Sequence, residues 1–297
     1  MNVAKSTACS LAASLLMVAP CVSANELEKI RASKAIIVAH RDASLPFSYL
    51  DDGKPIGYSI DLCLKVVDAI KRELKLPALE IKWLPVTSAT RIPAIAQGKA
   101  SLECGSTTNN AERRKQVDYS IAHFISASRF LVKSGSGIGN VQDLAGKTVI
   151  STRGTTNLKI VHRINDEHGL KMIVLDANDH AEAFALVASG KAHAFAMDDV
   201  LLYGLRANSA SAKDFDVVGK PMTIEPYAVM LPKNEPEFKR VVDQEVRRII
   251  VSGEINGIYR KWFERPIPPK GVNLDLPMPY MLRESFKYPS DKVGDLN

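Results

Sequence analysis

The sequence predicts an α/β protein built from two lobes. From Ala35 onward, short apolar runs alternate with helix-length amphipathic runs, as in parallel α/β units. A Gly- and Ser-rich stretch, residues 134–147, divides this alternation into two halves. Extended segments, FISASRFLVK and PYAVMLPK, stand on either side of the second half. We therefore expect two crossings between the lobes, near residues 129–133 and 226–231.

The spacing of apolar residues predicts the strands and helices of the two halves. In the first half the expected strands are Ile36–Ala39, Leu79–Leu84 and Ala100–Glu103, and the expected helices are Ser59–Leu74 and Ala89–Gln97. In the second half the expected strands are Thr148–Ser151, Met172–Leu175, Ala192–Met197 and Asp216–Val218, and the expected helices are Thr156–Glu167, His180–Ser189 and Asp199–Ala207.

The chain after the second crossing is predicted to return to the first lobe. An apolar stripe over Glu235–Val251, with Pro236 in the first turn, predicts a long helix. Gly253 can end it, and Glu254–Glu264 reads as a second, shorter helix. The proline-rich tail from Pro266 is expected to run extended.

These elements give explicit lobe boundaries. Lobe one is expected to contain residues 25–130 and 228–297, and lobe two residues 134–226.

The first 24 residues have the pattern of a cleaved secretory signal peptide. Lys5 is followed by an apolar run over Leu11–Val18, which is too short to span a bilayer, and by the small residues of Val22–Ala24. Cys21 raises the alternative of a lipoprotein, although Pro20 fits a lipidation box poorly. We expect a mature protein of the periplasm that begins at residue 25.

Charge and length describe an ordinary globular protein. The formal net charge is +6, and it falls to +5 when Lys5 leaves with the signal peptide. Basic residues are spread along the chain, which argues against nucleic acid binding. A weakly positive surface attracts acidic solutes. We expect a monomer without a cofactor or a metal.

Two cysteines, Cys63 and Cys104, remain after signal cleavage. They can form a bridge in an oxidising compartment. However, Cys63 lies on the apolar side of a predicted helix and Cys104 ends a predicted strand, so two buried free thiols are the preferred interpretation.

Polar residues gather at the carboxyl ends of the predicted strands, where open parallel sheets bind ligands. His40 and Arg41 follow the first strand, the segment 105–113 follows the third, and Asp198 follows the sixth. Within ECGSTTNNAERR, the hydroxyls of Ser106, Thr107 and Thr108 and the guanidinium of Arg113 can converge on one small anion.

Three arginines in such positions, Arg41, Arg91 and Arg113, indicate a ligand with more than one carboxylate. A single arginine after a strand is more commonly a surface or structural ion-pair residue. Asp198 and Asp199 can both start a helix. We expect Asp199 to do so and Asp198 to face the cleft. His180 is equally readable as a first-turn helix residue.

Eight segments together resemble the periplasmic solute-binding proteins of polar amino acid ABC transporters (solute-binding protein family 3), and most of all those that bind glutamate and aspartate. The segments are HRDASLPFSY, GYSIDL, PVTSATRIPAIAQGKA, ECGSTTNNAERR, GTTN, NDHAEAF, MDDVLL and ERPIPPK. The resemblance covers nearly the whole mature chain. It implies a type II periplasmic-binding-protein fold, α/β with two lobes joined by paired hinge strands, and a permease partner.

The resemblance also implies roles for ten residues. Ser106, Thr108 and Arg113 would hold the α-carboxylate, with Thr155 and Thr156 closing on it from lobe two. Asp198 would accept the α-ammonium. The side-chain carboxylate would be surrounded by Arg41, Ser88, Arg91 and His180. Arg153, Asn157 and Val229 depart from the family pattern; Val229 stands where near relatives can have Cys, which further disfavours a bridge to Cys104.

These expectations describe a binding protein and not an enzyme. The alternatives are a protein for another polar amino acid and an enzyme on the same fold. An enzyme needs a poised acid or base, and the sequence has no metal-spaced His/Cys cluster, G-x-S-x-G elbow, P-loop or G-x-G-x-x-G motif. The sequence does not rank glutamate against aspartate, since one methylene is worth only about 1 kcal/mol.

Overall fold

A computed structural model describes residues 25–292 of the chain. The predicted signal peptide, with its cleavage site and Cys21, lies outside these residues. Within them, no helix has the length and apolar character needed to cross a membrane.

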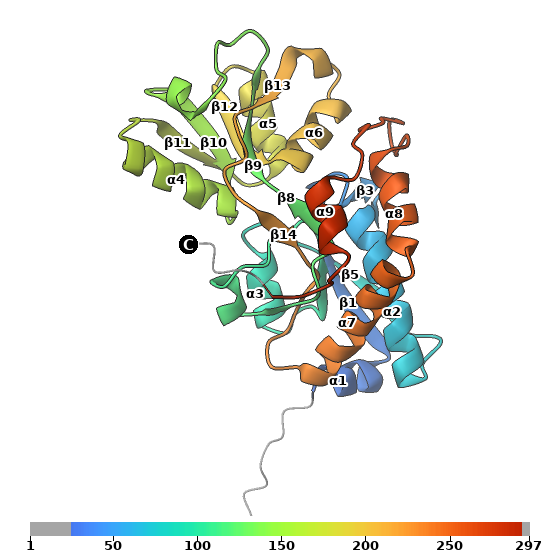
Figure 1. Ribbon diagram of the computed structural model, residues 1–297. Coiled ribbons are helices and arrows are strands. Elements are labelled where there is room, and N and C mark those ends of the chain that lie inside the picture. Colours follow the sequence, from blue (N-terminus) through green and yellow to red (C-terminus); the bar gives the residue numbers. More distant parts are fainter. Residues whose placement is uncertain (1–24, 293–297) are drawn as a thin grey trace, which may run out of the picture.

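The lower lobe of Figure 1 is built on a five-stranded sheet with the order β5-β1-β6-β15-β7. The strands are β1 (Ala35–His40), β5 (Glu80–Pro85), β6 (Leu102–Cys104), β7 (Asp118–Tyr119) and β15 (Met230–Leu231). β1 runs parallel to β5 and β6, whereas β15 runs antiparallel to β6 and β7. The helices of this lobe are α1 (Glu26–Ser33), α2 (Tyr58–Leu74), α3 (Arg91–Ala96), α7 (Pro236–Val251) and α8 (Glu254–Phe263).

The upper lobe holds a second five-stranded sheet with the order β11-β10-β12-β9-β13. Its strands are β9 (Ser128–Lys133), β10 (Thr148–Thr152), β11 (Ile173–Ala177), β12 (Ala194–Asp198) and β13 (Phe215–Val218). β10 runs parallel to β11 and β12, and β9 runs antiparallel to β12 and β13. The helices of this lobe are α4 (Thr156–His168), α5 (His180–Ala188) and α6 (Asp199–Asn208).

Local sequence explains why these elements begin and end where they do. α4 begins at the N-cap Thr155, whose hydroxyl accepts a hydrogen bond from Leu158 N, and it ends at Gly169 in the left-handed conformation. α7 has Pro236 in its first turn and buries the apolar stripe that contains Phe238 and Ile249. The long helices and the longer strands agree with the predicted ranges to within two residues at each end.

Two antiparallel strands, β8 (Phe124–Ser126) and β14 (Glu225–Tyr227), pair with each other between the two main sheets. Residues 129–133, where the first crossing was expected, belong to β9, a strand of the upper sheet, and β8 precedes them in the chain. At the second crossing, Tyr227 ends β14, and Met230–Leu231 is already a strand of the lower sheet.

Short elements were missed because their local patterns are weak. Strands β2 (Ala43–Ser44), β3 (Ser48–Asp51) and β4 (Lys54–Ile56) form a small three-stranded sheet. The tail, expected to be extended, contains the short helix α9 (Tyr280–Ser285). Helix α1 was not predicted either, although the sequence indicates its start: Asn25 caps it by accepting a hydrogen bond from Glu28 N.

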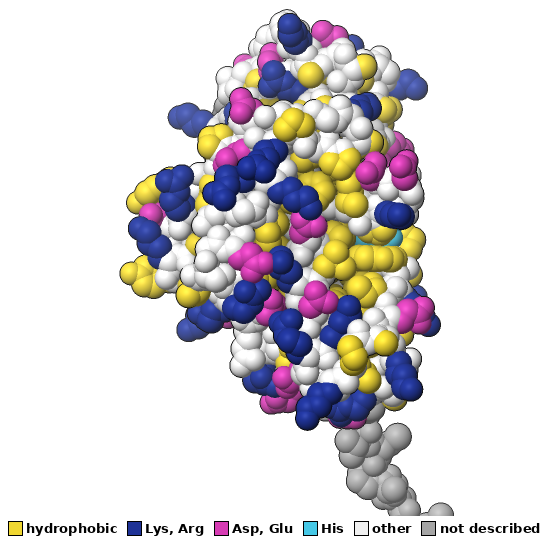
Figure 2. Space-filling view, turned by 90° about the vertical axis from the view of Figure 1, so that its right-hand side faces the viewer, with side chains coloured by type: hydrophobic (Ala, Val, Ile, Leu, Met, Phe, Trp, Pro, Cys, Tyr) yellow, Lys and Arg dark blue, Asp and Glu magenta, His cyan; other side chains and the backbone are white. Residues whose placement is uncertain are grey.

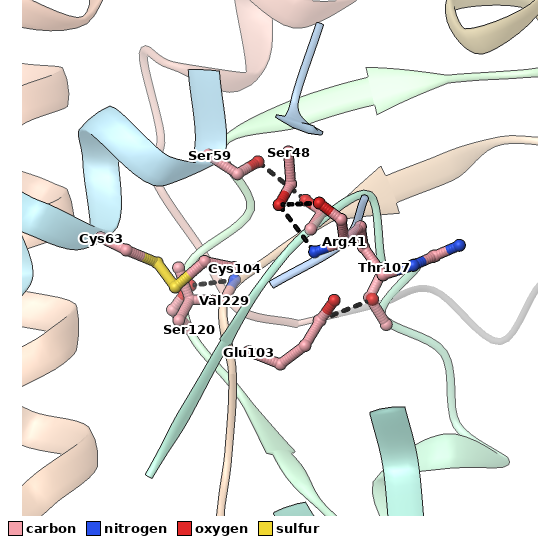
Figure 3. The surroundings of a disulfide bond; sticks show 10 residues. Arg41, Ser48, Ser59, Cys63, Glu103, Cys104, Thr107, Ser120 and Val229 are labelled. Atoms are coloured by element: carbon pink, nitrogen blue, oxygen red, sulfur yellow. Dashed lines mark hydrogen bonds between the residues drawn. A yellow bond between two sulfur atoms is a disulfide. The ribbon is translucent and has the colours of Figure 1, made fainter. Parts of the chain in front are cut away.

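A disulfide joins Cys63 of α2 to Cys104 at the end of β6 (Figure 3). This corrects the preference for two free thiols. Both cysteines are fully buried. Apolar neighbours in the sequence are compatible both with buried free thiols and with a buried disulfide, so they could not distinguish the two. The bridge ties α2 to the start of the polar segment 105–113.

Candidate functional site

The carboxyl ends of the central strands of both sheets point toward the space between the lobes. From the lower lobe, β1 leads to Arg41, and β6 leads to the segment 105–113. From the upper lobe, β10 leads to the N-terminus of α4, and β12 ends at Asp198. Parallel strands thus deliver polar residues from distant parts of the chain to one interlobe site.

A small cavity of about 10 Å³ lies at this site and is lined by both lobes. Eight of the ten predicted site residues line it: Ser88, Arg91, Ser106, Thr108, Thr155, Thr156, His180 and Asp198. Three further residues line it that the sequence analysis did not assign there: Asn157, Met197 and Leu201.

Arg91 is the buried cation of the cavity wall. Its Nη1 donates to Thr107 Oγ1 at 2.7 Å and to Ser106 O at 3.4 Å. Burial, followed by the charges of Arg113 and Arg41, lowers the Arg91 pKa to about 9. Within residues 25–292, Arg91 Nε and the neighbouring Ser88 Oγ have no hydrogen-bond partner. The wall therefore presents polar groups able to bind a ligand.

Arg41 and Thr107 lie behind the wall and do not line the cavity. Arg41 is fully buried; its backbone N donates to Ser48 Oγ at 2.9 Å, and its Nη1 has no partner among residues 25–292. Its charge still lowers the pKa values of Arg91 and His180. Thr107, which the sequence analysis grouped with Ser106 and Thr108 around one anion, instead bonds to Arg91 and Glu103.

Arg113 connects the two lobes. Its Nη1 donates to Thr108 O at 2.9 Å in the lower lobe, and its Nη2 donates to Gly154 O at 3.2 Å in the upper lobe. It lines a second cavity, next to the first, together with Gly154 and Lys159. Arg113 is therefore in contact with both lobes, and a change in the distance between the lobes would alter its hydrogen bonds.

His180 is the first residue of α5, and its Nδ1 lies 2.8 Å from Thr152 Oγ1. Burial, and then the positive charges of Arg41 and Arg91, hold the His180 pKa well below its usual value. The imidazole is thus neutral at physiological pH, with one ring nitrogen as a donor and the other as an acceptor.

Asp198 provides the negative charge of the cavity. Its Oδ1 accepts from Asn157 Nδ2 at 2.9 Å, and its Oδ2 accepts from the Tyr227 hydroxyl. Burial, followed by the nearby charge of Glu225, raises the Asp198 pKa to about 7. Asp199, the first residue of α6, does not line the cavity; its side chain accepts from Ser126 Oγ and Val200 N.

The upper lobe also presents the N-terminus of α4. The side chains here already have partners: Thr155 Oγ1 donates to Thr152 O at 2.6 Å, and Thr156 Oγ1 donates to Glu225 Oε2 at 2.9 Å. The first N–H groups of a helix have no intrahelical acceptor and favour an anion. A carboxylate at this end of the cavity would meet the backbone of α4 more readily than these two hydroxyls.

Three supporting residues were missed because their partners are remote in sequence. Asn157 was noted only as a departure from the family pattern, but it holds Asp198 and accepts from Ser128 Oγ. Tyr227 and Glu225 come from β14, a strand whose short sequence shows only extended character. Among residues 25–292, no group of three or more His, Cys, Asp or Glu is placed to hold a metal ion.

Residues 36–265 match the bacterial extracellular solute-binding proteins, family 3. The chain belongs to this family. It is 45% identical over 99% of its length, and 99% of the relative, to an "L-glutamate/L-aspartate-binding protein" of Pseudomonas aeruginosa. It is 42% identical over 90% of its length, and 89% of the relative, to a "Glutamate/aspartate import solute-binding protein" of Salmonella typhimurium. The family consists of solute-binding proteins and not of enzymes.

Solved structures show the same fold. A cysteine-binding protein from Campylobacter jejuni superimposes with a TM-score of 0.72 at 22% identity, covering 86% of this chain and 97% of that one. An ancestral arginine-binding protein bound to arginine gives 0.70 at 25% identity, covering 77% and 98%. The chain thus has the type II periplasmic-binding-protein fold with two sheet-rich lobes.

Proposed function

We propose that this chain captures an acidic amino acid, glutamate or aspartate, between its lobes and delivers it to the membrane permease of an ABC transporter. The observation that carries the proposal is the set of buried donors in and behind the cavity wall: Arg41 Nη1, Arg91 Nε and Ser88 Oγ have no partner within residues 25–292. Buried guanidinium groups are costly unless an anion pairs with them. A side-chain carboxylate supplies that pair.

His180 completes the pocket for this carboxylate. We infer that the Thr152 hydroxyl donates to His180 Nδ1, at 2.8 Å, which leaves Nε2–H as a donor. An amide side chain would offer these groups one neutral oxygen and an NH2 group that faces cations. Charge and hydrogen-bond polarity both favour the acid over the amide.

The opposite end of the cavity suits the α-amino and α-carboxylate groups of the ligand. Asp198, held by Asn157 and Tyr227, accepts from the ammonium group. Ser106, Thr108 and Arg113 of the lower lobe bind the α-carboxylate. The backbone N–H group of Thr156, in the first turn of α4, approaches it from the upper lobe.

Sheet membership supports a division into two lobes close to the expected one. We propose that residues 25–123 and 228–292 form one lobe and residues 128–223 the other, with the β8–β14 pair as the hinge. The same division describes how a ligand between the lobes can be enclosed by a hinge motion.

The family description supports a location outside the cytoplasm. We propose a periplasmic monomer, exported by the cleaved signal peptide at residues 1–24. Basic and acidic side chains are interspersed on the face drawn in Figure 2, which supports the expectation that nucleic acid is not a partner.

A relative at 29% identity is an "ABC transporter glutamine-binding protein" of Bacillus subtilis, so a neutral ligand is the main competitor. Cationic amino acids are disfavoured by the three arginines. A thermal-shift comparison of the twenty amino acids decides between the ligands, because a ligand at 100 times its Kd adds about 2.7 kcal/mol to the free energy of unfolding. Glutamate or aspartate should raise Tm far more than glutamine or asparagine. Equal shifts for acids and amides would contradict the proposal.

A further inference from the structure

An acidic side chain lies beneath the arginines of the pocket. Glu103, in β6, is 0% exposed. Its Oε2 accepts from the Thr107 hydroxyl at 2.7 Å, as Figure 3 shows, and its Oε1 has no partner among residues 25–292. A Cβ atom on Gly105 would stand 2.3 Å from Oε1, so a side chain at this position would displace the carboxylate. An ionised group in such a place needs compensation by nearby charge.

That compensation comes from the two arginines assigned to the side-chain carboxylate of the ligand. Arg91 Nη1 donates to Thr107 Oγ1 at 2.7 Å, and Thr107 donates onward to Glu103. The hydroxyl of Thr107 thus links the guanidinium to the carboxylate in one chain of hydrogen bonds. The negative charge of Glu103 also acts on Arg41, where it is the largest charge effect that raises the pKa.

We propose that Glu103 is a positioning residue that fixes Arg91 through Thr107 and neutralises one of the two positive charges of the Arg41–Arg91 pair. The pair and Glu103 together carry one net positive charge. One ligand carboxylate then neutralises the group, whereas an amide leaves it charged. Glu103 therefore limits how strongly the pocket holds an acid, which favours release as well as capture.

The two effects can be separated by substitution. Glu103→Gln keeps an oxygen that accepts from Thr107 but removes the charge, so the pocket becomes more positive. We expect the ratio of the Kd for glutamine to that for glutamate to rise by about tenfold, which corresponds to 1.4 kcal/mol. Thr107→Val removes the hydroxyl link and frees Arg91, so this ratio should fall by about tenfold. Thr107→Ser restores the hydroxyl and should restore the wild-type ratio.

Isothermal titration of wild type and the three variants with glutamate and glutamine measures these ratios, and circular dichroism checks that each variant is folded. A role in packing alone would weaken both ligands equally. An unchanged ratio in Glu103→Gln or in Thr107→Val therefore overturns the proposal; if Glu103→Gln does not fold, Thr107→Val against Thr107→Ser decides. The inference rests on the proposed function. The wild-type protein tests that function by itself: if it does not prefer glutamate to glutamine, the proposed function is refuted, whatever the variants show.

Discussion

Three buried arginines, Arg41, Arg91 and Arg113, distinguish the site at the level of single residues. Arginine is seldom fully buried without a partner, because its desolvation is costly. Here backbone carbonyl groups and the Thr107 hydroxyl satisfy only part of the donor capacity. Arg91 lines the first cavity, Arg113 lines the second, and Arg41 lies behind the wall, so we expect each arginine to have a distinct effect on binding.

Arg113→Ala should weaken every amino acid, whereas Arg91→Ala should weaken mainly acidic ones. In the proposed binding mode, Arg113 binds the α-carboxylate, which all amino acids share, and its removal leaves a buried carboxylate unpaired at a cost of roughly 3–5 kcal/mol, or about two to three and a half decades in Kd. In the same mode, Arg91 faces the side-chain carboxylate, so its loss should narrow the difference in affinity between glutamate and glutamine. Titration calorimetry of both variants with both ligands measures this division. Near wild-type glutamate binding by Arg113→Ala would contradict it.

Asp198 should make binding depend on pH. Its pKa in the folded protein without ligand is raised to about 7, above the 3.8 of an unperturbed aspartate, by burial and by the charge of Glu225. Because the folded state then retains the proton more strongly than the unfolded state, the stability that this group contributes is lost as pH rises from about 4 to 7. An ammonium ligand has the opposite effect, since it requires the ionised carboxylate. Affinity should therefore fall as the pH is lowered through 7, and at pH 5.5 it should be about thirtyfold weaker than at pH 8.

Titration of the protein with glutamate at pH 5.5 and 8, in buffers of different ionisation heat, measures both the affinity and the proton released. His180 does not account for a change in this range, because its pKa lies well below the usual value. Glu225→Gln is the matched variant: it preserves an acceptor for Thr156 and removes the neighbouring charge, so the change should move to lower pH. A pH-independent affinity between 5.5 and 8 would show that Asp198 does not receive the ammonium.

At the level of elements, the long helices and seven strands of the two main sheets followed from the sequence because their patterns are local, whereas the two-residue strand β7 was not predicted. The apolar period of Tyr58–Leu74 and the caps of α4 are set by neighbours within a few residues. The position of polar residues at strand ends was also predictable, since parallel sheets fix that geometry. The pairing of strands was not predictable from the sequence, and residues 129–133, where a crossing was expected, belong to β9 of the upper sheet. Ligand roles of the site residues remain predictions.

Contacts between distant elements could not be read from the sequence. The Asn157–Asp198–Tyr227 group joins α4, β12 and β14, and no local pattern relates these three segments. The cysteines posed the same problem: a buried thiol and a buried disulfide have the same apolar neighbours. The three-dimensional distance, 6.2 Å between the Cα atoms of Cys63 and Cys104, settled the pairing.

The disulfide should stabilise the lower lobe. It closes a loop with a sequence separation of 41 residues, for which chain entropy predicts about 4 kcal/mol. The double variant Cys63→Ala/Cys104→Ala should lose most of this free energy of unfolding in urea titrations, and its affinity should fall less than its stability because both cysteines lie outside the cavity lining. As a control, the free thiols of the mature wild-type protein are counted after unfolding without a reducing agent, which tests whether the bridge is formed. Two reactive thiols there would contradict the bridge.

At the scale of the whole molecule, function depends on how closely the two lobes approach. Hydrogen bonds from Arg113 to Gly154 O and from Lys159 to Glu112 Oε1, at 2.6 Å, join them across the cleft. The lysine–glutamate pair is exposed, so it adds little to stability. Gly154 lies close to the backbone of the opposite lobe at Ser88 and Ala89, beside the cavity, so a larger residue there should block closure.

Gly154→Ala should prevent full closure and so weaken ligand binding. A Cβ atom at Gly154 would lie 2.6 Å from Ala89 Cα and 2.7 Å from Ser88 O, both of them backbone atoms of the opposite lobe. The upper lobe must then move back from the lower one. Apparent affinity falls in proportion to the population of the closed state, and we expect a loss of tenfold or more. Titration calorimetry with glutamate measures this loss, and small-angle scattering with saturating ligand should show a larger radius of gyration than the wild type.

The matched control is Gly137→Ala. Gly154 and Gly137 have similar positive φ angles, 78° and 74°, so alanine strains the backbone alike at both positions. At Gly137, however, a Cβ atom meets nothing within 4 Å. Backbone strain therefore lowers Tm in both variants, while contact between the lobes is lost only in Gly154→Ala. Equal affinities for glutamate in the two variants would mean that the ligand is bound without the close approach of Gly154 to Ser88 and Ala89, and that the closed arrangement is not required for binding.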